Sequence, residues 1–348
     1  MNLVVNIEKR LRDFTLCANF TLTDTTLALL GASGSGKSMT LKCIAGLETP
    51  DRGQIILNGR TLYDSSAGVN LPPQERSVGY LFQNYALFPN MTVRENIIFA
   101  LDGSREEKEH LLAENVARFS LEGLEDARPS ALSGGQQQRV AFARILARGA
   151  DVLLLDEPLS ALDTHLKWQI ETALREILMG QNIAAILVTH DRDEAFRIAQ
   201  EIATVDRGQL TPPMDRHELF RSPGTCAGAR LTGCKNISAA RRVDAAHIEA
   251  TDWGITLAVT DDVTDAHHIA IRAHYFVPVQ EDGANVFPAQ IVEMIESTFS
   301  MIVMLRFADG AHLVRWEVDK PAWEALHVSE NASLRICFPP DALMLLRD

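Results

Sequence analysis

The fold is decided by a short apolar run, Leu27-Ala28-Leu29-Leu30, that leads into Gly31-Ala32-Ser33-Gly34-Ser35-Gly36-Lys37-Ser38. The octapeptide matches the phosphate-loop pattern G-x-x-x-x-G-K-[ST], and the apolar residues before it predict a buried strand. Helical spacing follows over Met39–Ala45. A glycine loop between a strand and a helix turns backbone N–H groups and the helix N-terminus toward phosphate oxygens. Because a chance glycine loop is not expected at this spacing after an apolar strand, the stretch predicts a nucleotide-phosphate site in an α/β fold.

The loop residues have distinct expected roles, with ATP and Mg²⁺ as the expected cofactors. Lys37 is expected to reach the β- and γ-phosphates, and the Ser38 hydroxyl to ligate Mg²⁺. The other predicted phosphate contacts are Gly31, Ser33, Gly34, Ser35, Gly36 and Met39.

A second apolar strand, Val152–Leu155, ends in the acidic pair Asp156-Glu157. Asp156 is placed to hold Mg²⁺, directly or through water. Glu157 is placed to act as the general base that polarises the attacking water. The alternative for an acidic pair at this position is a helix cap.

Strands and helices alternate along the first two thirds of the chain. Further buried strands are expected over Ala185–Thr189 and Ile202–Val205, and helices over His165–Met179 and Arg192–Ala199. This alternation predicts a mainly parallel sheet covered on both faces. Antiparallel strands at an edge of the sheet are expected over Leu3–Ile7 and Phe14–Leu22, and a further strand over Ile55–Leu57. Two more helices, over Arg105–Phe119 and Gln136–Arg148, are expected in a helical part.

The element Leu132-Ser133-Gly134-Gly135-Gln136-Gln137-Gln138-Arg139 stands between the two halves of the phosphate site. With this element the chain resembles the ATP-binding cassette (ABC) ATPase family. The resemblance implies that Ser133, Gly134, Gly135 and Gln136 bind the γ-phosphate of an ATP held by a second subunit. The expected functional unit is therefore a homodimer with two ATP molecules between its subunits.

The same resemblance implies roles for other positions. The segment Pro158-Leu159-Ser160-Ala161-Leu162-Asp163 would cross the dimer interface through Ser160 and Asp163, which favours catalysis over helix capping for the acidic pair before it. His190 would contact the γ-phosphate and hold Glu157 and the water in line. Gln83 would sense Mg²⁺ and the attacking water. Residues 85–89 would either meet a membrane partner or pack under the helical part.

The residue that stacks on adenine is left open. ABC ATPases usually supply an aromatic ring about 25 residues before the lysine of the phosphate loop, a position that falls at or near Leu11 in this chain. Phe14 is the nearest aromatic residue. It is either the stacking residue or a core residue of its strand.

Within the family, Leu81–Pro89 and Leu155–Asp163 resemble importer ATPases, most of all the molybdate/sulfate branch, which the segment Pro72–Arg76 also fits. This implies a peripheral protein on the cytoplasmic face of the cell (inner) membrane, bound to permease subunits and served by an extracytoplasmic solute-binding protein. Molybdate or tungstate is the expected cargo. Sulfate, thiosulfate or another small solute is the alternative.

The composition of the chain changes after about residue 207, where prolines and glycines predict a linker. Six short strands are then expected, over Ile255–Val259, Ile269–Ile271, Gln290–Ile295, Met301–Phe307, His312–Trp316 and Leu334–Phe338. They predict a small all-β barrel or sandwich. By resemblance this is an OB-like (TOBE/MOP-like) accessory or regulatory domain over 230–348, after a nucleotide-binding domain over 1–229 whose helical subdomain covers about 84–150.

An oxyanion effector is a possible ligand of the C-terminal domain, since similar domains in molybdate importers bind the ion. Hydroxyl groups and cationic side chains suit an oxyanion. The candidates are Lys235, Ser238, Ser297, Ser300 and Arg306, each of which is otherwise a surface residue. Metal binding by His267, His268 and His274 is disfavoured, because adjacent residues of a strand point to opposite faces.

Composition limits the remaining functions. The net charge of −13 disfavours a nucleic-acid or anionic-lipid surface. No apolar run reaches the roughly 18 residues that a membrane-spanning helix needs, and five scattered cysteines indicate reduced thiols. A soluble ABC ATPase acting on nucleic acid would mostly carry coiled-coil insertions or a second cassette, which are not found here. A sensor with a dead cassette is disfavoured because Lys37, Asp156, Glu157 and His190 are all present.

Overall fold

The computed structural model describes residues 1–82, 85–99, 101, 103–147, 149–160, 164–180, 184–328 and 332–348. The chain divides into two compact units, Met1–Arg216 and His217–Asp348. Within these ranges no helix is long and apolar enough to cross a membrane.

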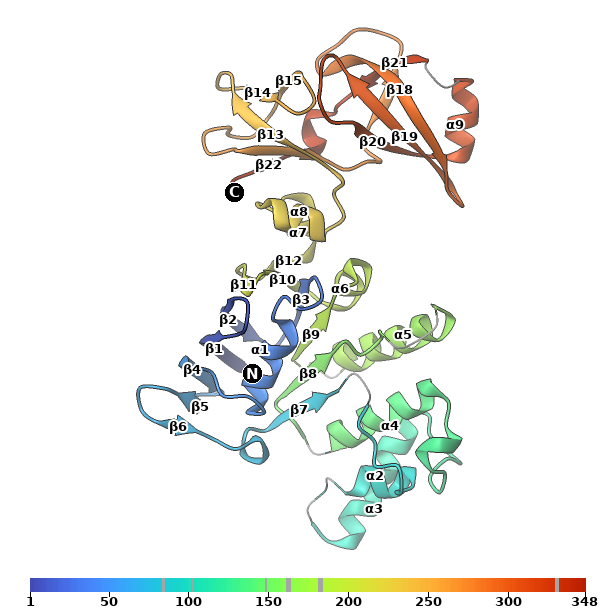
Figure 1. The fold of residues 1–348 in the computed structure, drawn as a ribbon. Coiled ribbons are helices and arrows are strands. Elements are labelled where there is room, and N and C mark those ends of the chain that lie inside the picture. The colour runs from blue at the N-terminus through green and yellow to red at the C-terminus, as the bar shows by residue number, and fades with distance from the viewer. Residues whose placement is uncertain are drawn as a thin grey trace. The chain divides into compact units, whose positions relative to one another are not determined.

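The first unit is built on a mixed sheet of 12 strands (Figure 1). Its strands run in the order β6-β5-β4-β1-β2-β11-β10-β3-β9-β8-β7, and β12 pairs with β10. They are β1 (Asn2–Arg10), β2 (Thr15–Thr23), β3 (Thr26–Gly31), β4 (Arg52–Leu57), β5 (Arg60–Asp64), β6 (Val69–Asn70), β7 (Val78–Leu81), β8 (Val152–Asp156), β9 (Ala185–Thr189), β10 (Glu201–Asp206), β11 (Gln209–Leu210) and β12 (Met214–Asp215).

The parallel and antiparallel parts of this sheet follow the sequence patterns. β3, β7, β8, β9 and β10 pair in parallel, and every residue of β3 and β9 is buried, as their continuous apolar runs predict. β1, β2, β4, β5 and β6 pair antiparallel at one end of the sheet. β1 and β2 alternate buried and exposed residues, as expected for strands with one face on the core. The predicted mixed sheet with an antiparallel part is confirmed.

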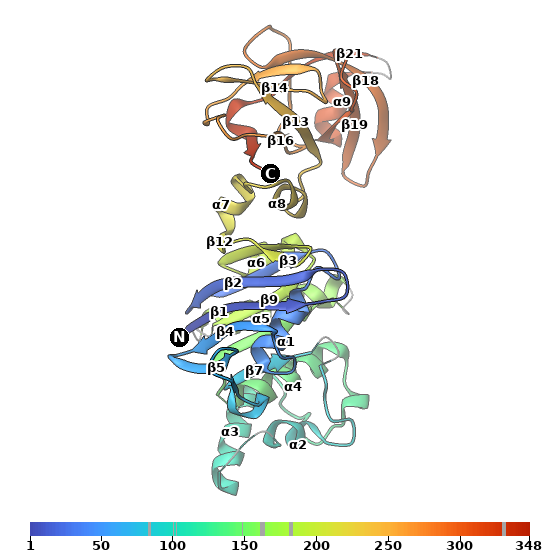
Figure 2. The same cartoon turned by 60° about the vertical axis from the view of Figure 1, so that its left-hand side comes forward.

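Helices of the first unit form two groups. α1 (Lys37–Ala45), α5 (Thr164–Gly180) and α6 (Arg192–Ile198) contact strands or helices of the sheet layer. α2 (Val93–Ile98), α3 (Arg105–Arg118) and α4 (Gly134–Ala147) pack on one another and form a lobe (Figure 2). Short 3-10 helices cover Pro73–Glu75 and Pro129–Ala131.

The sheet order brings three functional segments to one edge. β3 lies beside β9, and β9 lies beside β8, all in parallel. The carboxyl ends of parallel strands meet at the same edge of a sheet, which is where ligands bind in such folds. The phosphate loop after β3, the acidic pair that ends β8, and His190 after β9 are therefore neighbours.

Two five-stranded antiparallel sheets make up most of the second unit, which confirms the predicted all-β fold. One sheet has the order β15-β14-β13-β16-β22 and the other β17-β21-β18-β19-β20. The strands are β13 (Asn236–Arg242), β14 (His247–Ala250), β15 (Ile255–Ala258), β16 (His268–Ile271), β17 (Val277–Val279), β18 (Val286–Glu296), β19 (Ser300–Phe307), β20 (Val314–Asp319), β21 (Ser333–Cys337) and β22 (Leu343–Leu346). Their shared core is mainly aliphatic and includes a group of aromatic rings: the ring of Phe338 lies 4.9 Å from Phe276 and 5.1 Å from Phe307 between centroids.

Helices occur in the second unit where the sequence analysis expected none. α7 (Arg216–Arg221) and α8 (Cys226–Leu231) occupy the predicted linker, α9 (Lys320–Leu326) follows β20, and Pro340–Ala342 is a 3-10 helix. The division between the two units falls within the predicted linker, but the helices there were not foreseen: Thr225 caps α8 by accepting a hydrogen bond from the Gly228 N–H (3.0 Å), and Ala229 is fully buried. The predicted boundary at 229/230 falls within α8, whereas the two compact units divide at 216/217.

Candidate functional site

The phosphate loop adopts the backbone that its glycines permit. Gly34 and Gly36 have φ values of 81° and 111°, in the left-handed region that favours glycine. Gly36 is the N-cap of α1. The hydroxyl of Ser35 is buried and has no hydrogen-bond partner among the described residues. A buried donor left unpaired at a helix N-terminus suits a phosphate oxygen.

Lys37 folds back over this loop. Its ammonium group donates to the carbonyl oxygens of Gly31 and Ala32, both at 2.8 Å, and only 4% of the residue is exposed. Burial lowers the pKa of Lys37, while the nearby Glu157 and Asp156 carboxylates act in the opposite direction. A buried cation whose hydrogen bonds go to backbone carbonyl oxygens is well suited to phosphate oxygens, as the sequence predicts.

Asp156 and Ser38 meet at the first turn of α1. The Ser38 hydroxyl donates to Asp156 Oδ1 at 2.7 Å, and the Tyr80 hydroxyl donates to Asp156 Oδ2 at 2.8 Å. Burial is the main reason that the pKa of Tyr80 is raised, so this hydroxyl stays a donor. A carboxylate and a hydroxyl are hard oxygen ligands that fit Mg²⁺. When bound, Mg²⁺ neutralises charge on the β- and γ-phosphates.

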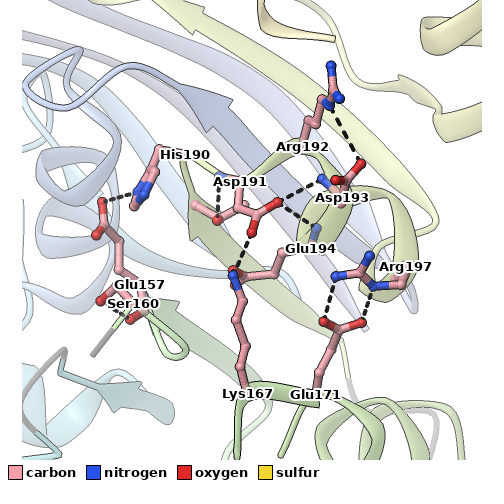
Figure 3. Close-up of polar contacts among 11 residues, drawn as sticks. Glu157, Ser160, Lys167, Glu171, His190, Asp191, Arg192, Asp193, Glu194 and Arg197 are labelled. Carbon is pink, nitrogen blue, oxygen red and sulfur yellow. Dashed lines mark hydrogen bonds and ion pairs between the residues drawn. The ribbon is translucent and has the colours of Figure 1, made fainter. Parts of the chain in front are cut away.

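The proposed base and its histidine also come together. His190 Nδ1 lies 3.5 Å from Glu157 Oε1 (Figure 3). Glu157 has a φ of 46°, and its N–H donates to the Val188 carbonyl on β9 at 3.0 Å. The Ser160 hydroxyl donates to the Glu157 carbonyl at 3.0 Å, which closes the turn after β8. The carboxylate is 19% exposed and the imidazole 52% exposed, so both can reach a ligand on the surface.

Two of the predicted site residues, Gln83 and Asp163, lie outside the described residues. The other members of the predicted phosphate and hydrolysis set lie around β3, β8 and β9. The sequence analysis did not foresee Tyr80, because its role depends on the pairing of β7 with β8, far apart in the chain.

The serine-glycine-glycine element forms the start of α4. The Ser133 hydroxyl accepts from the Gln136 N–H at 3.3 Å, and Gln136 Oε1 accepts from the Ser133 N–H at 2.8 Å. This reciprocal cap places the helix start at Gly134 instead of the predicted Gln136. The Gln138 amide donates to the Pro158 carbonyl at 3.1 Å and so ties α4 to the segment after Glu157.

An ion-pair network behind His190 was not predicted from the sequence. Lys167 Nζ on α5 lies 2.5 Å from Asp191 Oδ2 and 3.6 Å from Glu194 Oε2 (Figure 3). Nearby, Arg197 on α6 forms a two-pronged pair with Glu171 on α5. Burial raises the pKa of Glu194 to about 7, although Lys167 opposes the change. The only sequence signal was the charge pattern of two helices, which does not reveal that they pack together.

Phe14 lies next to the phosphate loop, with its ring against glycine backbone. A Cβ atom added at Gly36 would lie 3.5 Å from Phe14 Cε2, and one added at Gly208 would lie 2.4 Å from Phe14 Cδ2. Leu11 closes the turn before it, with its N–H donating to the Phe14 carbonyl at 2.9 Å. Both side chains are half-buried. Of the two candidates for adenine stacking, Phe14 is therefore the aromatic one beside the loop.

The candidate oxyanion residues of the second unit fall into separate places. Lys235 immediately precedes β13 and Ser238 lies within it, and the Ser238 hydroxyl is buried and donates to the Ala239 carbonyl at 2.8 Å. Ser297 and Ser300 flank the turn between β18 and β19, where the Ser300 hydroxyl donates to Glu317 Oε1 at 3.1 Å. The remaining candidate, on β19, is the exposed Arg306.

His268, which the sequence analysis set aside as a metal ligand, lies in a cluster with Cys226 and Asp348. One potential ligand atom of each lies within 4.8 Å of the others. Hydrogen bonds already join the three: the Cys226 N–H donates to Asp348 Oδ1 at 2.6 Å, and His268 Nδ1 lies 2.6 Å from the Asp348 carbonyl oxygen. These contacts connect α8 to β16.

Comparison with known proteins gives consistent matches. A family model described as ABC transporter matches residues 18–160. The spermidine/putrescine import ATP-binding protein of Rubrobacter xylanophilus is 36% identical over 345 residues, covering 94% of this chain and 89% of that protein. The sulfate/thiosulfate import ATP-binding protein of Thermosynechococcus vestitus is 34% identical over 313 residues, 89% of this chain and 87% of its own length.

A third relative aligns over a shorter part. The Fe(3+) ions import ATP-binding protein of Pectobacterium atrosepticum is 45% identical over 199 residues, which is 57% of this chain and 57% of that protein. Among solved structures, a dimeric ATP-binding cassette in a post-hydrolysis state, bound to ADP and phosphate, has a TM-score of 0.51 and 28% identity. It covers 62% of this chain and 99% of its own.

Proposed function

This chain belongs to the ABC transporter family as the ATP-binding subunit of an importer, and from that premise we propose that it energises the uptake of an oxyanion. It is an ATPase whose hydrolysis is coupled to transport. The proposed cargo is molybdate or tungstate, with sulfate or thiosulfate as the second choice. The sulfate/thiosulfate relative, aligned along 89% of the chain, supports the oxyanion class.

Ferric iron is the competing cargo, because the iron relative has the higher identity within its shorter alignment. The test uses host cells in which the chain carries Glu157→Gln, with uptake of radiolabelled molybdate, sulfate, ferric iron and putrescine measured separately. We expect loss of molybdate uptake alone, restored by the wild-type chain. Loss of sulfate uptake alone would favour the second choice, and loss of iron or putrescine uptake alone would reject the oxyanion class.

The proposed hydrolysis follows from the geometry around β8 and β9. Glu157 takes a proton from the attacking water, and His190, at 3.5 Å from that carboxylate, keeps the base and the γ-phosphate in line. Lys37 exchanges its carbonyl partners for phosphate oxygens. The observation that carries the proposal is the meeting of Lys37, Ser38, Asp156 and Glu157 at one sheet edge. Loss of hydrolysis with retained ATP binding in Glu157→Gln is the expected result.

We propose that each site is completed by a second copy of the chain. ABC cassettes dimerise, as the related post-hydrolysis structure illustrates. The capped start of α4 offers backbone N–H groups at Gly134 and Gly135, together with the positive end of a 14-residue helix. In the dimer these groups would bind the γ-phosphate held by the partner's loop. ATP would then join the two copies, and hydrolysis would release them.

A pocket beside β7 is the proposed docking place for a permease subunit. It has a volume of about 430 Å³ and is lined in part by Phe82, Phe88, Phe99 and Arg144. Three exposed aromatic rings at one pocket suit the apolar face of a short permease helix. Arg144 holds one wall by donating to the Ala86 carbonyl at 2.8 Å. The chain would thus work at the cytoplasmic face of the membrane through a partner.

Substitution of an exposed ring tests this docking surface. Phe99 is 62% exposed, so Phe99→Asp should leave ATP hydrolysis by the isolated subunit intact and prevent co-purification with the permease. Leu47→Asp, at a side chain that is 44% exposed elsewhere in the same unit, serves as the matched control. Normal complex formation by Phe99→Asp would reject the pocket.

The second unit is proposed to bind the transported oxyanion as an effector that favours the separated motor. The candidate residues are Lys235, Ser238, Ser297, Ser300 and Arg306. Calorimetric titration of the full-length chain with molybdate, tungstate and sulfate tests this proposal. Saturable binding of molybdate and tungstate supports feedback by the cargo, binding of sulfate alone supports the second choice, and no binding leaves this unit with a structural role.

A further inference from the structure

The hydroxyl of Tyr80 has a role in the metal site that the sequence motifs do not assign. We propose that Tyr80 is a positioning residue: its hydroxyl orients the Asp156 carboxylate toward Ser38 and thereby sets the affinity of the ATP site for Mg²⁺. The inference rests on the proposed function of Asp156 as a magnesium ligand.

Both oxygens of the Asp156 carboxylate accept a hydrogen bond. Oδ1 accepts from the Ser38 hydroxyl at 2.7 Å, and Oδ2 accepts from the Tyr80 hydroxyl at 2.8 Å. The two donors approach different oxygens, so they fix the rotation of the carboxyl group about the Cβ–Cγ bond. The oxygen that faces Ser38 is the one placed for Mg²⁺, because the serine hydroxyl is the second expected ligand.

Strand pairing explains why Tyr80 can make this contact. Tyr80 on β7 lies opposite Leu154 on β8, in parallel register. Leu154 and Asp156 are two residues apart and therefore point to the same face of the sheet. Diagonal neighbours on adjacent strands lie within reach of an aromatic side chain. A tyrosine at this register position is thus long enough to place its hydroxyl on the carboxylate.

Groups that hold a metal ligand in place affect metal affinity directly. Loss of such an outer hydrogen bond typically lowers metal affinity about 10- to 100-fold. The effect is specific to the metal, because the phosphates are held by the loop and Lys37 and not by Tyr80. Nucleotide affinity without metal should therefore be insensitive to the hydroxyl.

Tyr80→Phe removes the hydroxyl and little else. The ring stays in place to contact Phe82, whose centroid lies 4.5 Å away, so the lining of the nearby pocket is kept. Tyr63→Phe is the matched control. Its hydroxyl is also buried and donates to the Pro50 carbonyl at 2.7 Å, but it makes no described contact with Asp156.

The experiment measures Mg²⁺ binding without turnover. The full-length chain is saturated with ADP, and the Mg²⁺ concentration for half-maximal binding is determined by calorimetry. ADP affinity is measured in parallel with a chelator present. We expect the Mg²⁺ midpoint of Tyr80→Phe to rise about 10- to 100-fold, with chelator-treated ADP affinity and thermal midpoint unchanged. Tyr63→Phe should match the wild type in Mg²⁺ midpoint.

Asp156→Asn distinguishes the positioning role of Tyr80 from the metal-binding role of Asp156. If Asp156→Asn shifts the Mg²⁺ midpoint and Tyr80→Phe does not, the positioning role is overturned and the metal ligand stands. If Asp156→Asn does not shift the Mg²⁺ midpoint, both the metal-binding role of Asp156 and the positioning role of Tyr80 are overturned. Equal shifts in Tyr80→Phe and Tyr63→Phe, or loss of metal-free ADP binding in Tyr80→Phe, would also overturn the inference, since either result indicates general loosening. In the Asp156→Asn background, Tyr80→Phe should add nothing.

Discussion

Replacing Glu194 by glutamine should change how the stability of the protein depends on pH. Glu194 is 3% exposed, and burial raises its pKa from 4.5 to about 7. Below pH 4.5 the carboxyl group is protonated in both the folded and the unfolded states, so it does not lower the free energy of unfolding. As the pH rises through about 7, the carboxyl group of the folded state ionises and the protein must hold a buried charge. The difference between the two values corresponds to about 3 kcal/mol.

Burial fixes the sign of this effect, because it outweighs the charged groups around Glu194. Lys167 lowers the pKa of Glu194, whereas Asp191 and Glu171 raise it, and burial outweighs them all. Between about pH 5 and about pH 8 the wild type should lose about 2.5 kcal/mol of unfolding free energy relative to Glu194→Gln. Lys167→Met removes the cation, so the upper end of the pH range over which stability is lost should move upward, while its lower end stays in place.

Urea unfolding of both chains, followed by far-ultraviolet circular dichroism at several pH values, measures this difference. Other titrating groups are shared by the two chains, so they cancel in the comparison. A difference in unfolding free energy that stays constant across the whole pH range would refute the assignment of a raised pKa to a buried Glu194. A difference that changes in the opposite direction would mean that Lys167, and not burial, dominates.

Three further predictions concern other parts of the first unit. Ser133→Arg should leave ATP binding by the monomer intact and abolish hydrolysis, and weaker ATP binding by the monomer would contradict the shared site. Arg76→Met removes a buried guanidinium that donates to four acceptors around the end of α1, and should lower the unfolding free energy by about 3 kcal/mol, measured by urea titration. Phe14→Ala should weaken binding of ATP but not of inorganic triphosphate, whereas equal loss of both would assign Phe14 to the core.

Local sequence patterns predicted the elements that carry the phosphate chemistry. A continuous apolar run predicts each of three strands: the one before Gly31, the one that ends at Asp156 and the one before His190. Their parallel order then determines that their ends meet. These features depend on short segments, so a single sequence is sufficient to find them.

Contacts between distant segments could not be predicted in the same way. The hydrogen bond from Tyr80 to Asp156 joins residues 76 positions apart, and it requires the register of β7 on β8. The pair of Lys167 and Asp191 requires the packing of α5 on α6. α8 was missed for another reason: a proline and a glycine before it indicated a linker, although Thr225 supplies a helix cap.

The distance between Glu157 and His190 depends on more than those two residues. Glu157 directly follows β8, the strand that precedes α5, and His190 directly precedes Asp191, the N-cap of α6. Asp191 accepts hydrogen bonds from the N–H groups of Asp193 and Glu194, and its other oxygen pairs with Lys167 on α5. One carboxylate thus fixes the start of α6 and ties it to α5. We therefore expect that loosening the contact between α5 and α6 would disturb the 3.5 Å separation of Glu157 and His190 and slow hydrolysis.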